Sequence, residues 1–117
     1  MQPYFFIRAD KKYLRVNFDE ILYVEACVNY IRIVMQDKTF ITLLSMNQME
    51  RVLPASLFCR VHRSYIVALK RITAFDHEIV YLDSKQFPLS KHYKMSLMKR
   101  VMIVISEVRM TKALMTQ

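Results

Sequence analysis

Apolar residues recur at every second position in several short segments of this chain, and polar residues separate one segment from the next. A period of two places alternate side chains on one face of an extended strand, whereas helices repeat every three or four residues. The segments are rich in β-branched and aromatic residues, so we predict a mostly β fold of short antiparallel strands. The alternating residues are Leu14, Val16 and Phe18; Leu22, Val24 and Ala26; Ile31, Ile33 and Met35; and Val80 and Leu82.

The chain contains no glycine, so its turns must use other residue types. Asp and Asn tolerate tight-turn geometry, and with Ser and Lys they occupy the polar breaks between the alternating segments. The predicted strand connections are 17–20, 36–38, 76–78 and 83–86. No repeat or flexible linker divides the 117 residues, so we expect a single domain over 1–117, with a helix or tail from about residue 91.

Two segments follow helical spacing instead. Ser45 and Gln48 have the spacing of a capping box, and Met49 and Leu53 follow on one face before Pro54 stops the helix. The second helix is expected to begin with Ser90 as its N-cap and to end near Ser106. Its apolar stripe would consist of Tyr93, Leu97, Val101 and Ile105. Periodicity does not decide whether residues 107–117 continue this helix.

The charge of the chain is strongly positive and unevenly distributed. The formal net charge is +8, and residues 59–117 hold 11 Lys and Arg against 4 Asp and Glu. Such an excess favours polyanions, either nucleic acid or anionic lipid, although a solvated face without a partner is the simpler alternative. No apolar run is long enough to cross a bilayer and no leader is recognisable, so we expect a cytoplasmic protein that does not enter the membrane.

Nothing in the sequence indicates an enzyme, a metal site or a cofactor. The acidic residues near the basic half, Asp76, Glu78 and Asp83, lack ligand spacing, and no phosphate-binding loop or catalytic motif is present. Cys27 and Cys59 are isolated, which predicts buried free thiols. Oxidation of Cys59 that releases a ligand from the neighbouring loop is an alternative role for that thiol.

The segment from Phe58 to Val67, FCRVHRSYIV, combines basic and hydrogen-bonding residues with flanking apolar ones that would hold a loop in place. Arg63 carries a planar fork suited to a phosphate or a guanine edge, His62 can donate to either, and Ser64 can reach a phosphate oxygen. Taken alone, the segment also fits an ordinary turn with Arg60 on the surface and Ser64 as a cap.

The chain resembles the LytTR family of bacterial DNA-binding domains over about residues 5–93. The most specific part is FCRVHRSYIV at 58–67, and DEILYVEACVNYIRI at 19–33 and FPLSKHY at 87–93 are similar to further family segments. The resemblance implies an elongated mostly β fold of small packed antiparallel sheets with short helices, without a helix-turn-helix. It also implies that loop side chains enter successive major grooves of duplex DNA.

The resemblance implies three contact stations on this chain: Asn29 and Tyr30, then His62 and Arg63, then Lys91 and His92. Arg63 is the expected base reader and Lys91 the phosphate anchor, beside an anion-binding helix start at Ser90. The full set of expected DNA-binding residues adds Arg60, Ser64, Ser90 and Lys94. Tyr30 fits either the interface or the core, whereas Tyr65 and Ile66 are expected to pack and fix the loop.

The expected function is sequence-specific binding of double-stranded DNA at promoter repeats, in transcriptional regulation by a bacterial two-component response regulator. The expected partners are that duplex, a second copy of the chain on DNA, and an upstream receiver domain that is not among these residues. The alternative is a basic module without DNA specificity, in which the Met-rich C-terminal segment lies on an anionic membrane or docks onto a protein helix. Its apolar stripe and the flanking Lys94, Lys99 and Arg100 permit this.

Overall fold

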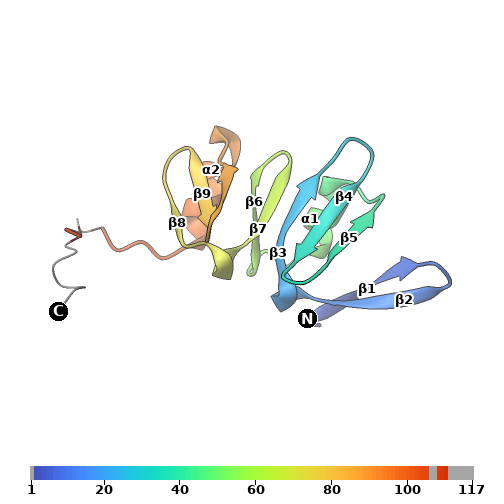
Figure 1. Cartoon of the computed structure of the whole chain (residues 1–117). Helices are drawn as coiled ribbons and strands as arrows, with labels where there is room; N and C mark the ends of the chain where they lie inside the picture. The colour runs from blue at the N-terminus through green and yellow to red at the C-terminus, as the bar shows by residue number, and fades with distance from the viewer. Residues whose placement is uncertain (1, 106–107, 111–117) are drawn as a thin grey trace.

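The computed structural model describes residues 2–105 and 108–110 and shows three small antiparallel sheets in a row (Figure 1). A two-stranded hairpin lies at one end, a five-stranded sheet in the middle and a three-stranded sheet at the other end. The molecule is elongated, with extents of 57 × 35 × 30 Å. The predicted mostly β fold of small packed sheets is confirmed. No helix of the described residues is long and apolar enough to span a membrane.

The N-terminal hairpin consists of β1 (Tyr4–Ala9) and β2 (Lys12–Asn17) and lies at one end of the molecule (Figure 1), where Val16 is buried in a hydrophobic core. Asp10 makes the tight turn with a positive φ of 49°, a conformation that Asp tolerates better than most residues. The short 3-10 turn η1 (Phe18–Glu20) follows, where a connection was predicted. Phe18 therefore packs into the core from this turn and not from a strand.

The central sheet has the strand order β5-β4-β3-β7-β6, with every neighbouring pair antiparallel. Its strands are β3 (Ile21–Ala26), β4 (Ile31–Met35), β5 (Thr39–Thr42), β6 (Phe58–His62) and β7 (Tyr65–Ala68). Neighbouring residues of β7 belong to different clusters, Ile66 to one hydrophobic core and Val67 to the other. Because strand residues alternate between faces, this sheet is covered on both sides.

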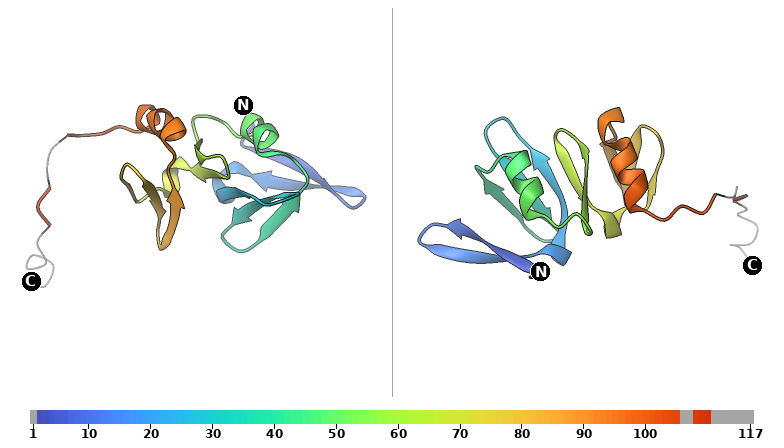
Figure 2. Two further views of the ribbon diagram at one scale, coloured as in Figure 1. Left: turned by 90° about the horizontal axis from the view of Figure 1, so that it is seen from above. Right: turned by 180° about the vertical axis from the view of Figure 1, so that it is seen from behind.

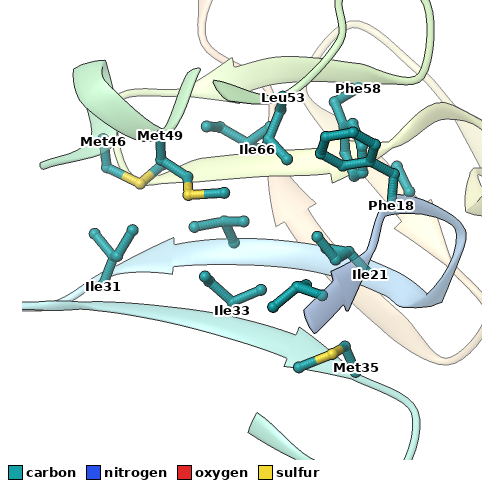
Figure 3. Packing of buried hydrophobic residues seen from close by; sticks show 13 residues of the cluster. Phe18, Ile21, Ile31, Ile33, Met35, Met46, Met49, Leu53, Phe58 and Ile66 are labelled. Atoms are coloured by element: carbon teal, nitrogen blue, oxygen red, sulfur yellow. The ribbon is translucent and has the colours of Figure 1, made fainter. Parts of the chain in front are cut away.

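The first core lies between the central sheet and helix α1 (Met46–Val52), as Figure 3 shows. The predicted capping box is confirmed, because the backbone N–H of Gln48 donates to Ser45 Oγ and the backbone N–H of Ser45 donates to Gln48 Oε1. Met49 is completely buried against the sheet, and Leu53 is buried just beyond the last helical residue. This short helix is thus held by its cap and by one apolar face.

The second core lies on the other face of the central sheet. The small sheet of β8 (Ala74–Phe75), β9 (Ile79–Leu82) and β10 (Lys85–Pro88) contributes Val80 and Leu82, which share one face as predicted. Helix α2 (Lys91–Arg100) contributes Leu97. The view from behind shows both helices on one side of the molecule (Figure 2). In the described residues they are separated by five strands, so they form no helix-turn-helix.

A β-bulge interrupts the alternation that was predicted for Leu22, Val24 and Ala26. The register of β3 against β4 shifts between Ile21 and Tyr23. As a result, Leu22 packs against the second core, whereas Val24 and Ala26 belong with the first. The predicted single stripe is therefore wrong at Leu22, because a bulge inserts one extra residue and reverses the side on which the following residues lie.

The last helix is shorter than predicted. It ends at Arg100, and Val101 already has extended dihedral angles of φ −118° and ψ 148°. Val101 still packs partly against the second core, but Ile105 is 94% exposed, so the predicted four-residue helical stripe is wrong in its second half. The segment from Val101 to Ile105 is rich in β-branched residues, which form helices poorly. The predicted end at Ser106, and residues 107 and 111–117, lie outside the described residues.

Candidate nucleic-acid interface

The three expected contact stations lie along one edge of the molecule, the upper edge in Figure 1. The turn between β3 and β4 and the turn between β6 and β7 share an end of the central sheet, since the backbone N–H of Ala26 donates to the Ser64 carbonyl at 2.9 Å. The backbone N–H of Ser90 donates to the Val61 carbonyl at 2.9 Å, which brings the start of α2 beside β6. Backbone hydrogen bonds therefore join segments that are far apart in the sequence.

The first station is the tight turn that connects β3 to β4. It is closed by the backbone N–H of Cys27, which donates to the Tyr30 carbonyl at 2.8 Å. Asn29 is exposed and Tyr30 is 37% exposed, so neither side chain belongs to a core. A side-chain hydrogen bond with Cys27 raises the pKa of the Tyr30 hydroxyl. Tyr30 therefore stays a neutral hydroxyl near pH 7, able to donate and accept.

The second station is the turn between β6 and β7. Arg63 is exposed, and His62 and Ser64 are half-buried. The backbone N–H of Ser64 donates to His62 Nδ1 at 3.1 Å. Because Nδ1 accepts, the neutral ring carries its proton on Nε2 and presents a donor there. The His62 ring also packs on Tyr65, with ring centroids 5.7 Å apart, so its orientation is held from a second direction.

Arg60 was expected among the DNA contacts, and it lies beneath the second station with only 9% of its surface exposed. Its Nη1 donates to Asn47 Oδ1 at 2.6 Å and to Glu50 Oε1 at 3.1 Å. Its Nη2 donates to the Arg63 carbonyl at 2.6 Å, and its Nε to the His62 carbonyl at 3.4 Å. The alternative of an ordinary turn with Arg60 on the surface is therefore wrong.

The third station is the start of α2. Ser90 occupies the N-cap position as predicted, but its side chain makes no capping hydrogen bond, and Oγ is buried without a hydrogen-bond partner. Lys91 and His92 are exposed, and Lys94 is half-buried one turn along. The first turn of the helix contains no acidic residue. Positive side chains therefore add to the partial positive charge of the helix N-terminus.

Four polar residues that support the stations were not among the expected contact residues. Arg32 pairs with Glu25 at 2.6 Å at the base of the first station, and this bond raises the pKa of Arg32. Asn47 and Glu50, on α1, hold Arg60 as described above. Glu25 and Arg32 lie within the family-like segment 19–33, but no motif marks Asn47 or Glu50. Their only signal is the spacing of Asn47 and Glu50, which places both on one helical face.

The two cysteines differ in their environment. Cys59 is 1% exposed, and burial is the main reason why the pKa of its thiol is raised. Cys27 is half-buried in the first station, and both thiols are free. The prediction of a buried free thiol is therefore confirmed for Cys59 and only partly correct for Cys27.

Among residues 2–105 and 108–110, no three His, Cys, Asp or Glu side chains form a metal-binding group.

Comparison with known proteins identifies the fold and the family of the chain. The sensory transduction protein LytT of Bacillus anthracis and the protein of the same name from Bacillus cereus are each 27% identical to the chain over 94 residues. Those matches cover 75% of this chain and 38% of each relative. A solved LytTr DNA-binding domain from Bacillus cereus has the same fold, with a TM-score of 0.70 at 24% identity, over 86% of this chain and 97% of that one. The family model of the LytTr DNA-binding domain matches residues 11–102, and the chain belongs to this family.

Proposed function

We propose that the chain binds double-stranded DNA with sequence preference, through the edge that carries the three stations, and regulates transcription. The observation that carries this proposal is the alignment of the stations. Two turns and one helix start meet at one edge through backbone hydrogen bonds, and each presents exposed polar or basic side chains there. Membership in the LytTr DNA-binding domain family supports the same conclusion.

The proposed contacts divide into base reading and backbone anchoring, as is usual for such interfaces. Arg63 suits the bidentate acceptor edge of guanine, and Asn29 suits the paired donor and acceptor of adenine. His62 offers Nε2–H to a base or phosphate oxygen. Lys91 serves as a point charge for a phosphate next to the start of α2, and His92 lies beside it.

The remaining expected contact residues have supporting roles in the proposed DNA binding. Tyr30 and the half-buried Ser64 each offer a hydroxyl to a phosphate, and Lys94 adds charge one turn beyond Lys91. Ser90 positions the helix start, because its backbone N–H bonds to β6 while its hydroxyl is enclosed. Arg60 lies too deep for the same role.

The alternative of a membrane-surface or protein-interaction module loses the apolar stripe of the last helix, because Leu97 is completely buried in the second core and the helix ends at Arg100. Beyond the helix, Met102, Val104 and Ile105 are exposed, but family membership favours DNA binding. The relatives are called sensory transduction proteins, and the chain spans 38% of their length. We therefore also propose that the chain acts as the output domain of a two-component regulator and binds promoter repeats as a pair of copies.

The salt dependence of DNA binding tests the proposed function. If about five phosphates are neutralised, log K should fall with log salt at a slope of roughly −4 to −5. The assay is fluorescence anisotropy of a labelled duplex at several salt concentrations, with anionic lipid vesicles in a parallel sedimentation assay. Binding to vesicles but not to DNA, or a response to salt that is flat, would contradict the proposal.

A further inference from the structure

Arg60 fixes the backbone on both sides of the proposed base reader. Its guanidinium bonds to the carbonyl of His62, which belongs to the peptide unit before Arg63, and to the carbonyl of Arg63, which belongs to the peptide unit after it. The orientation of these two peptide units sets the φ and ψ angles of Arg63. The direction in which the Arg63 side chain leaves the turn therefore depends on one buried guanidinium.

The guanidinium is in turn oriented from the opposite side by helix α1. Nη1 donates both its hydrogens there, one to Asn47 at 2.6 Å and one to Glu50 at 3.1 Å. Four of the five N–H groups of Arg60 are thus occupied, which leaves little freedom for rotation. Its Cζ atom also lies 5.5 Å from the centre of the Tyr93 ring, so the first turn of α2 packs against the same group.

We propose that Arg60, held by Asn47 and Glu50, is the positioning residue for sequence reading by Arg63. Helix α1 then contributes to specificity without touching DNA. This inference rests on the proposed function and assigns a task to residues that have no contact with the duplex. A lysine at position 60 would not substitute, because a single ammonium group cannot bridge two carbonyls and two side-chain acceptors in one plane.

The test uses the exposed partners of Arg60, because a buried Arg60 variant can fail to fold. Asn47→Ala removes one acceptor without a change of charge, and Glu50→Gln adds one unit of positive charge while it weakens the ion pair. Both residues are exposed on α1. Arg51→Gln is the matched control, because Arg51 is exposed on the same helix and lies away from the Arg60 bonds. Arg60→Lys is added if circular dichroism shows that it folds.

Two quantities are measured for each variant: the ratio of affinities for a selected duplex and a random duplex, and the backbone NMR order parameters of residues 62–64. In Asn47→Ala and Glu50→Gln the ratio should fall at least about fivefold, the lower end of what one bidentate base contact supplies. Order parameters at Arg63 and Ser64 should fall as well. Glu50→Gln should keep its affinity for random DNA, because its net charge rises. Arg51→Gln should lower the affinity for both duplexes equally and leave the order parameters of the turn unchanged.

The outcomes separate this inference from the proposed function. A wild-type chain with no preference among duplexes would overturn the proposed function. Order parameters and affinity ratios in Asn47→Ala and Glu50→Gln that equal those of the wild type would overturn the positioning role of Arg60. A fall in the ratio without any loss of order in the turn would also overturn it, since the effect would then not pass through the backbone of Arg63.

Discussion

The different tasks proposed for Arg63 and Lys91 are open to a direct comparison of two alanine variants. Arg63 is exposed, and its carbonyl, not its side chain, makes the hydrogen bond that holds the turn. Lys91 is exposed at the first position of α2, and its side chain makes no hydrogen bond or ion pair with residues 2–105 or 108–110. The free energy of unfolding of each alanine variant should therefore lie within about 0.5 kcal/mol of the wild-type value, as is usual for exposed side chains.

The expected losses of binding differ in kind. Removal of a bidentate base contact costs about 1 to 3 kcal/mol on the preferred site, which corresponds to about 5- to 150-fold in affinity. Arg63→Ala should show this loss on the selected duplex and a much smaller loss on random DNA. Lys91→Ala should lower the affinity for both duplexes by a similar factor and reduce the slope of log K against log salt by about one unit.

Anisotropy titrations with the two duplexes at four salt concentrations provide both quantities, and urea unfolding of each variant provides the control for folding. If folded Arg63→Ala loses affinity for the selected and the random duplex by the same factor, Arg63 contacts phosphate only. The reading of sequence would then have to pass to His62, Asn29 or the start of α2.

Further predictions concern the fold and the thiols. Ser45→Ala should lower the free energy of unfolding by about 1 kcal/mol in a urea titration, through loss of the capping box, and no change would mean that packing alone holds α1. Leu97→Ala should cost about 2 to 5 kcal/mol because the side chain is completely buried, and a smaller loss would show that the second core refills the space. Cys27 should react with a neutral thiol reagent well before Cys59, whose thiol has a raised pKa, and equal rates would contradict the burial of Cys59. Hydrogen bonds from two backbone N–H groups lower the pKa of the Asp76 carboxyl. The contribution of Asp76 to stability is therefore complete above its unfolded pKa of about 3.9 and is lost as the pH falls through the folded value. Asp76→Asn should remove this pH dependence from acid unfolding curves.

The sequence predicts most of this fold because its local signals agree with one another. Ile31, Ile33 and Met35 alternate and all face the first core, and the Ser45 capping box begins a helix where predicted. The predictions are wrong where tertiary packing, and not the local sequence, determines the structure. The bulge at Leu22 places this residue on the second core, away from Val24 and Ala26, and no local pattern marks it. The last helix ends at Arg100, although its apolar spacing continues to Ile105.

The location of the candidate interface could be predicted only through the family resemblance, since the stations are far apart along the chain. Charge alone indicated the second half of the sequence, but Asn29 lies in the first half. The role of Arg60 could not be predicted, because its charge suggested a surface residue. Its partners Asn47 and Glu50 lie on α1, and tertiary packing brings this helix beside β6, which a local pattern does not show.

The central claim is that three stations on one edge bind the duplex together. The most direct test is a ¹⁵N NMR titration of the folded chain with a selected duplex at low salt, where electrostatic binding is strongest. We expect the largest changes of amide chemical shift in residues 27–30, 62–64 and 90–94, and small changes in the β1–β2 hairpin. Shifts concentrated in the hairpin or in residues 101–105, with the three turns unaffected, would contradict the account.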